Sequence, residues 1–141
     1  EMAKVLDSEG WFHTGDVATL RDDDCLRFFG RYKDLLKVGG ENVDPVEVEA
    51  FLLEHPAINR VQVVGVPDPR LSEVACACVV LQNDQQLTPA DLDSFCRGKM
   101  ASFKIPQHLV TMKDYPMTSS GKVQKFLLRE IAAEELGLSS G

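Results

Sequence analysis

The sequence predicts an α+β fold, in which a short β-sheet is packed with about three helices. Two apolar runs, residues 58–66 and 74–81, are bounded by turn-forming residues and have the length of buried strands. A capping residue followed by proline, at 44–45 and again at 88–89, marks the start of a helix in each case. A third helix is indicated from about 124 to 136. Strands and helices therefore alternate along one small domain.

The first part of the chain favours short strands and turns. Strands are expected at 11–12, 17–20 and 26–29, and the acidic turn at 21–24 should be exposed. A further strand at 35–38 leads into Gly39 and Gly40. A last strand is expected at 108–112.

The three helices each have a recognisable start or an apolar face. Asp44 and Thr88 are the predicted N-caps of the first two, and Gly137 is the predicted stop of the third. The apolar positions that share a face are Val48, Phe51 and Leu52, then Leu92, Phe95 and Cys96, and finally Leu128, Ile131 and Ala132.

Composition excludes several classes of function. At 141 residues with 44% hydrophobic residues, the chain has the material for one globular core. A net charge of −7 leaves no basic face for nucleic acid. No run approaches the roughly 20 apolar residues of a membrane span, and the start does not resemble a signal peptide. We therefore expect a cytoplasmic protein, with a mitochondrial location left open. We also expect a fragment of a longer chain, because the sequence starts at Glu1 without an initiator methionine, shortly before a Gly-Trp-Phe turn at residues 10–12.

The cysteines do not form a disulfide framework or a metal site by their spacing. Cys25, Cys76, Cys78 and Cys96 are sparse, and no histidine or second cysteine pair stands at ligand spacing from Cys76 and Cys78. We expect four reduced, structural thiols and no metal centre.

Three polar segments that contain glycine are the candidate functional regions: residues 11–16, 30–40 and 118–122. The third ends in Gly121-Lys122 and so has the Gly-Lys pair of a phosphate-binding loop. However, Pro116 stands where that loop needs its first glycine, and Val123 stands where it needs a hydroxyl residue for magnesium. A P-loop is therefore rejected.

In this order and spacing, the three segments resemble the signature motifs of the adenylate-forming (AMP-binding) superfamily, which includes acyl-CoA synthetases. Residues 11–16 resemble its aromatic-x-Thr-Gly-Asp motif, residues 30–40 with Glu47-Val48-Glu49 its Gly-Arg motif, and residues 116–122 its Pro-x-Thr-x-x-Gly-Lys motif. Residues 103–106, Phe-Lys-Ile-Pro, match a further family segment, in which we interpret Lys104 as structural. The resemblance covers essentially the whole chain.

The resemblance implies an acid–thiol ligase, which activates a carboxylic acid, here a fatty acid, with ATP and transfers the acyl group from the acyl-adenylate to CoA. Residues 1–32 would be the tail of the large N-terminal AMP-binding domain and residues 33–141 the mobile C-terminal domain. ATP, CoA and Mg²⁺ are implied, with Mg²⁺ held mainly by the N-terminal domain. That domain would be the partner of this one, and the fragment alone should be inactive.

The resemblance also implies a role for individual residues. Lys122 matches the catalytic lysine that reaches ATP during adenylation, where charge builds as pyrophosphate departs. Asp16 matches the aspartate that accepts hydrogen bonds from the ribose hydroxyls of ATP or AMP. Arg31 matches an arginine near the ribose and phosphates, for which a permanently charged guanidinium is suited.

Four more residues would serve the change between the two half-reactions. Lys33 matches the hinge, and Gly39 and Gly40 match the loop that leaves room for the pantetheine arm of CoA. Lys37, near that CoA tunnel, would contact the adenylate in the second state.

Two other functions stay open on the sequence alone. The first is an adenylation domain that loads a carrier protein, and the second is a non-catalytic interaction or regulatory module derived from this domain. The sequence does not specify the acyl substrate or its chain length.

Overall fold

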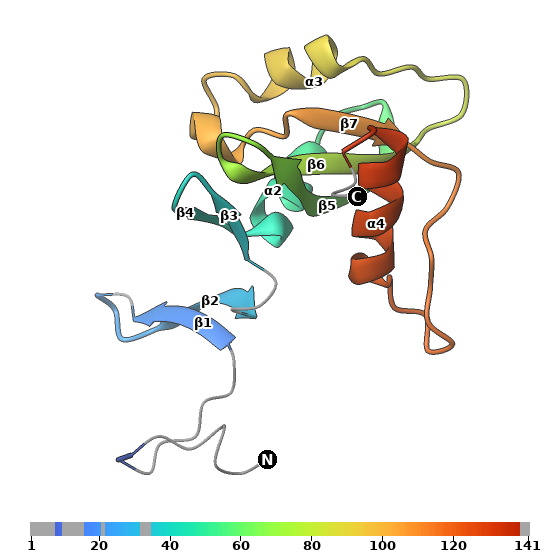
Figure 1. Ribbon diagram of the computed structural model, residues 1–141. Helices are drawn as coiled ribbons and strands as arrows, with labels where there is room; N and C mark the ends of the chain where they lie inside the picture. The colour runs from blue at the N-terminus through green and yellow to red at the C-terminus, as the bar shows by residue number, and fades with distance from the viewer. Residues whose placement is uncertain (1–7, 10–15, 21, 32–34, 139–141) are drawn as a thin grey trace. The chain divides into compact units, whose positions relative to one another are not determined.

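The computed structural model describes residues 8–9, 16–20, 22–31 and 35–138, so the strand predicted at 11–12 lies outside the described residues (Figure 1). The chain divides into two compact units, Glu1–Leu35 and Leu36–Gly141. The domain boundary predicted between residues 32 and 33 falls at residues that the structure does not describe, and it stays a prediction.

The first unit contains a two-stranded antiparallel ribbon of β1 (Asp16–Leu20) and β2 (Leu26–Arg31). The acidic turn between the strands is exposed over residues 22–24, as predicted. Cys25 is also exposed, so a structural role is wrong for this cysteine. The other three cysteines are buried, and all four are free thiols.

The second unit is built on a five-stranded sheet. Its strands are β3 (Leu36–Val38), β4 (Glu41–Val43), β5 (Ile58–Asp68), β6 (Ser72–Leu81) and β7 (His108–Thr111). The order is β4-β3-β6-β5, and β7 pairs with the same edge of β6 as β3, farther along the strand. Every ladder is antiparallel except that between β6 and β7. The predicted α+β class is confirmed.

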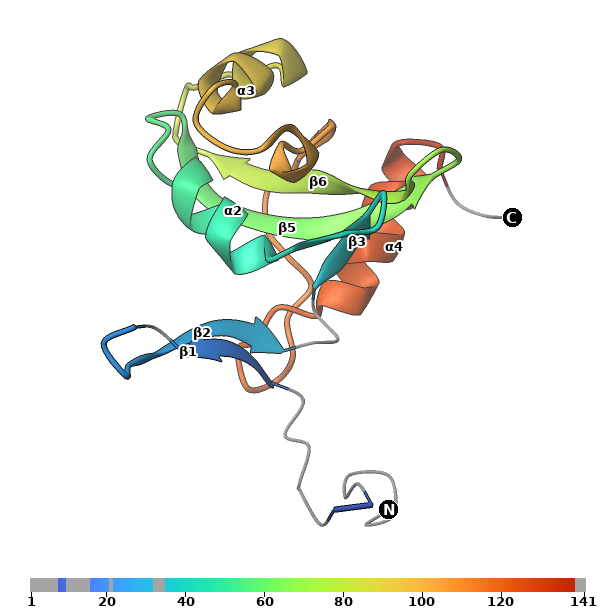
Figure 2. The same cartoon turned by 90° about the vertical axis from the view of Figure 1, so that its left-hand side faces the viewer.

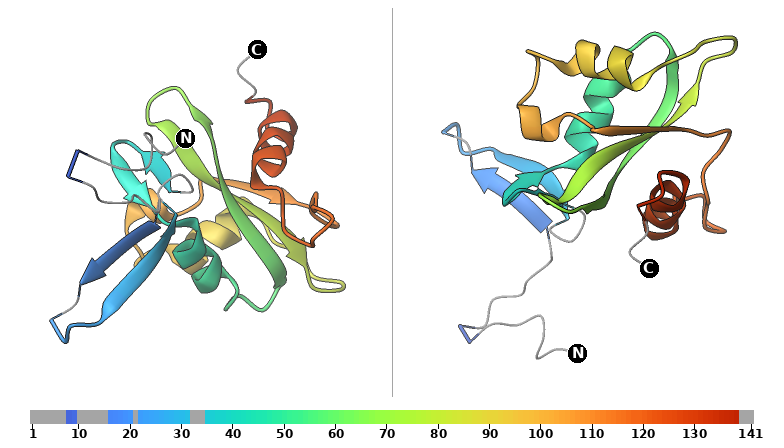
Figure 3. Two further views of the ribbon diagram at one scale, coloured as in Figure 1. Left: turned by 90° about the horizontal axis from the view of Figure 1, so that it is seen from below. Right: turned by 45° about the horizontal axis from the view of Figure 1, so that its top comes forward.

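Helices cover both faces of this sheet. α2 (Pro45–Leu52) and α3 (Pro89–Cys96) lie on one face, and α4 (Lys125–Glu135) lies on the other (Figures 2 and 3). The rings of Phe51 and Phe95 join α2 to α3, with their centroids 5.0 Å apart. Because both faces are covered, the consecutive residues 74–79 of β6 are all buried, and they form the centre of the core.

The predicted caps of the first two helices are present. The Asp44 carboxylate accepts a hydrogen bond from the Val46 N–H at 3.0 Å. Thr88 and Asp91 form a reciprocal capping box with two bonds of 3.1 Å. The start of α4 differs, because Gln124 makes no side-chain cap and the first turn contains no acidic residue.

β5 continues through Pro67, although the prolines after Val66 were predicted to end it. β5 is an edge strand, so alternate backbone N–H groups point away from β6. The Val63 N–H does so, because it donates to a side chain of α2, and residue 67 has the same orientation in this regular stretch of the ladder. The N–H that proline lacks is therefore not needed by the sheet.

Two elements were not predicted: β4 and a short 3-10 helix, η2 (Ser102–Lys104). β3 and β4 form a hairpin whose two turn residues, Gly39 and Gly40, have φ angles of +57° and +88°. Two consecutive positive φ angles define the tight turn that suits the twist of a hairpin, so the glycines set the geometry of this loop.

Candidate functional site

The segment that carries Lys122 is a tight hairpin, which we call the Lys122 loop (residues 116–124). The Thr118 N–H donates to the Lys122 carbonyl at 2.8 Å, and the Gly121 N–H donates to the Thr118 carbonyl at 3.0 Å. Gly121 has a φ of +85°, which side chains disfavour, and nothing stands within 4 Å of where its Cβ would be. Glycine is therefore needed here for backbone conformation and not for space.

The hydroxyl groups of the loop stabilise this turn. Thr118 Oγ1 accepts a bond from the Lys122 N–H at 3.1 Å and lies 2.9 Å from Ser120 Oγ. The backbone of Lys122 is therefore bonded through both its N–H and its carbonyl, whereas its side chain is exposed. The backbone of Lys122 is thus held within the loop while its side chain projects from the surface.

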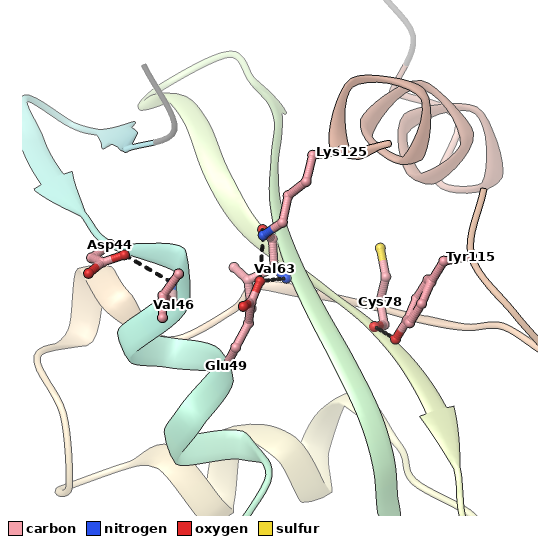
Figure 4. Close-up of polar contacts among 7 residues, drawn as sticks. All are labelled: Asp44, Val46, Glu49, Val63, Cys78, Tyr115 and Lys125. Carbon is pink, nitrogen blue, oxygen red and sulfur yellow. Dashed lines mark hydrogen bonds and ion pairs between the residues drawn. The ribbon is translucent and has the colours of Figure 1, made fainter. Parts of the chain in front are cut away.

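Tyr115 anchors the start of the Lys122 loop. Its buried hydroxyl donates to the Cys78 carbonyl in β6 at 2.7 Å (Figure 4). Burial raises the pKa of this hydroxyl above its ordinary value, so it stays a protonated donor.

Lys125 anchors the end of the loop through a contact set that we call the edge bridge (Glu49, Val63 and Lys125; Figure 4). The Lys125 ammonium pairs with the Glu49 carboxylate and donates to the Val63 carbonyl at 3.1 Å. Glu49 accepts the Val63 N–H at 2.8 Å. The free edge of β5 at Val63 is thus closed by two charged side chains, one from each face of the sheet.

A second carboxylate, Glu73 of β6, connects α4 to β3. It pairs with the Arg129 guanidinium at 3.1 Å and accepts the Lys37 N–H at 2.8 Å. A Cβ on Gly65 of β5 would lie 2.6 Å from one Glu73 oxygen, so a side chain at this position would displace the Glu73 carboxylate. The sequence reasoning did not find Lys125, Arg129 or Glu73, since these contacts join residues far apart in the chain.

The Gly39–Gly40 turn packs on one side only. The Gly39 N–H donates to the Leu71 carbonyl at 3.1 Å, and a Cβ on Gly39 would lie 2.9 Å from Leu71 Cδ2. Asp68 holds the facing turn by accepting the N–H groups of Leu71 and Arg70, and these bonds lower the pKa of its carboxyl. A Cβ on Gly40, by contrast, would have no neighbour within 4 Å, so the surface at this residue is open.

The structure therefore brings the predicted residues together in three groups. Asp16 and Arg31 are direct partners in the β1–β2 ladder. Lys37, whose side chain is exposed, lies in the same hairpin as Gly39 and Gly40. Lys122 lies in its own loop before α4. Lys33 lies outside the described residues.

Lys104 makes the structural contact that was expected of it, since its ammonium lies 3.1 Å from the Glu47 carboxylate of α2. Over the described ranges, no cluster of three or more His, Cys, Asp or Glu side chains could hold a metal ion. None of the helices in the described part of the chain has the length and apolarity to cross a bilayer.

The fold and its loops define a small α+β domain that presents a lysine loop and a glycine hairpin on its surface. The chain belongs to the family of AMP-binding enzyme C-terminal domains, whose model matches residues 47–122, a little over half of the chain. The matched segment starts in α2 and ends at Lys122.

The relatives with similar sequences are named as acyl-CoA synthetases or ligases. YngI of Bacillus subtilis, provisionally named an acyl-CoA synthetase, is 47% identical over 137 residues, which are 97% of this chain and 25% of that protein. The human mitochondrial medium-chain acyl-CoA ligase ACSF2 is 44% identical over 135 residues, which are 96% of this chain and 22% of that protein. The chain thus spans about a quarter of the length of these relatives.

A solved structure shows the same fold. ATP-bound MatB from Rhodopseudomonas palustris superimposes with a TM-score of 0.82 at 31% identity, covering 94% of this chain and 26% of MatB.

Proposed function

We propose that this chain is the C-terminal part of an acid–thiol ligase that activates a carboxylic acid with ATP and transfers the acyl group to CoA. The observation that carries the proposal is the exposed Lys122 side chain on a hydrogen-bonded hairpin, at the end of the segment that matches the AMP-binding family. The names of the relatives favour a medium-chain fatty acid as the substrate.

In the proposed first half-reaction, a carboxylate oxygen bonds to the α-phosphorus of ATP while the bond to pyrophosphate breaks. Lys122 would compensate the negative charge that collects on the phosphoryl oxygens. Asp16 would accept hydrogen bonds from the ribose and Arg31 would bind phosphate oxygens, which their placement as ladder partners supports. Mg²⁺ would be bound by the N-terminal domain of the full-length protein.

In the proposed second half-reaction, the CoA thiol attacks the acyl carbon and AMP leaves. Residues 33–141 would turn about Lys33 relative to the N-terminal domain, to which residues 1–32 belong. The Gly39–Gly40 turn would then face the pantetheine arm, with Lys37 beside it. The open surface at Gly40 supports this role. A cytoplasmic location remains our prediction, although the name of ACSF2 places that relative in mitochondria.

Pyrophosphate release by the full-length protein tests the proposal. Acids of graded chain length and aromaticity are supplied with ATP, and CoA is compared with a phosphopantetheinylated carrier protein as the acceptor. We expect release with medium-chain acids and transfer to CoA. Transfer to the carrier protein alone would favour a loading domain, and no release with any acid would favour a non-catalytic module.

Replacing Gly40 with leucine is expected to raise the KM for CoA severalfold, because the side chain would narrow the path of the pantetheine arm. Gly98→Leu is a matched control, since Gly98 also has a positive φ, of +80°, and equally open surroundings. Both variants therefore carry a similar backbone strain of about 1–2 kcal/mol. CoA kinetics that change equally in the two variants would remove Gly40 from the CoA path.

Replacing Lys33 with proline is expected to slow thioester formation more than adenylation, because proline fixes φ and would restrict rotation at a hinge. The two half-reactions are measured separately, with Lys33→Ala as the control that removes the charge but leaves the backbone free. If the ratio of the two rates is the same in the parent and in Lys33→Pro, the hinge is not at this residue.

A further inference from the structure

The edge bridge joins the start of α4, directly after the Lys122 loop, to α2 and β5. This helix start lacks the usual local stabilisation. Only Val123 and Gln124 separate Lys122 from Lys125. α4 begins there without a side-chain cap and without an acidic residue in its first turn. Its first residue is instead a lysine, whose positive charge is unfavourable at the positive end of a helix dipole. Tertiary contacts therefore hold this turn in place: the burial of Leu128 in the core and a polar contact of Lys125.

Glu49 supplies that contact and offsets the unfavourable position of Lys125. The Glu49 side chain is 14% exposed and that of Lys125 is 38% exposed, so the pair is only partly screened by water. The Lys125 ammonium has a second partner in the Val63 carbonyl, and Glu49 has one in the Val63 N–H. The start of α4 is thus located relative to both α2 and β5.

The Lys122 loop is held together by its own hydrogen bonds, so its direction depends on how it is attached to the rest of the unit. Its hydrogen bonds fix Thr118, Gly121 and Lys122 relative to one another but not to the sheet. The connection to the sheet comes from Tyr115 before the loop, from Lys125 after it, and from Val123, which packs against the core. A shift at Lys125 would therefore displace the end of the hairpin next to Lys122, and the ammonium of Lys122 with it.

We propose that Lys125, held by Glu49 and Val63, is a positioning residue for Lys122: it sets the place of the Lys122 ammonium during adenylation without touching the substrate. This inference rests on the proposed function of Lys122. Since a displacement of about 1 Å can slow an enzyme by about a hundredfold, losing the edge bridge should slow adenylation by about tenfold to a hundredfold. Thioester formation does not use Lys122 and should be nearly unchanged.

Four variants of the full-length protein test this. Lys125→Met removes the charge but keeps the length, and Glu49→Gln removes the ion pair but keeps an acceptor for the Val63 N–H. Lys125→Arg keeps both the charge and the donors. Lys104→Met is the matched control, because it breaks another Lys–Glu pair to the same helix α2 without contacting α4.

Two rates are measured: ATP–pyrophosphate exchange and thioester formation from the supplied acyl-adenylate. The acid is the one that the parent protein uses fastest among the straight-chain acids from acetate to palmitate. Lys125→Met and Glu49→Gln should lose exchange and keep thioester formation, Lys125→Arg should recover most of the exchange rate, and Lys104→Met should resemble the parent. If Lys125→Met does not fold, Glu49→Gln decides.

Two results would overturn the inference. The first is an unchanged exchange rate in Glu49→Gln and Lys125→Met. The second is an equal loss of adenylation and thioester formation in these variants, in proportion to a fall in their Tm. Lys122→Ala is measured alongside. If Lys122→Ala keeps full exchange, the proposed function of Lys122 itself is wrong. If Lys122→Ala loses exchange but Lys125→Met keeps the parental rate, only the positioning role is refuted.

Discussion

Replacing Lys122 with alanine in the full-length protein should slow ATP–pyrophosphate exchange by about a hundredfold to a thousandfold. This is the effect of removing one preorganised hydrogen-bond donor to an anion that develops in the transition state. The cause is local, because the substitution removes the ammonium but leaves the backbone bonds between Lys122 and Thr118 intact. Thioester formation from the supplied acyl-adenylate should persist, since the phosphoryl transfer has already taken place.

The control for this variant is Lys113→Ala, which removes another exposed lysine of the same unit. Substitutions at exposed positions usually change the free energy of unfolding by no more than about 0.5 kcal/mol, so both variants should keep the Tm of the parent. An equal loss of the two half-reactions in Lys122→Ala would exclude a role restricted to adenylation.

Replacing Leu128 with alanine should lower the free energy of unfolding of the chain by about 2–5 kcal/mol, the range for a buried leucine that leaves a cavity. Leu128 is fully buried and is the largest side chain that α4 adds to the core. Urea unfolding measures the effect, as a lower midpoint with an unchanged m-value.

The neighbouring Leu127 offers a matched control, because it is 40% exposed. Leu127→Ala makes the same chemical change one position along the helix and should cost much less stability. Similar losses in the two variants would mean that α4 does not bury the face assigned to it. A lower m-value for Leu128→Ala would instead indicate that the unfolding is no longer two-state.

The elements governed by local patterns could be predicted from the sequence. The cap of Asp44 and the capping box of Thr88 and Asp91 act within four residues. The predicted apolar faces of α2 and α3 pack into the core. On α4, Leu128 and Ala132 are buried as predicted, but Ile131 is only partly buried and Ala133 is buried in addition. β4 was missed because three residues after Gly40 carry too little pattern, and its pairing with β3 decides its conformation.

The candidate site was predictable to a smaller extent, and for a physical reason. Motif resemblance identified Lys122, Gly39 and Gly40, but it did not show what holds them. Glu49 was noticed as part of a motif, yet its partner Lys125 is distant in the sequence and comes close only when α2 and α4 pack on opposite faces of the sheet. A lysine at the start of a helix was the one local signal of such a partner.

The edge bridge also bears on how the domain avoids self-association. β5 is long, apolar and at the edge of the sheet, so a neighbouring molecule could add a strand to its unpaired backbone groups. Glu49 and Lys125 occupy both groups of Val63, the middle of that edge, and place two charges there. Opening of α4 would uncover a template for intermolecular β-pairing, so the contact that orients Lys122 would at the same time protect the protein against aggregation.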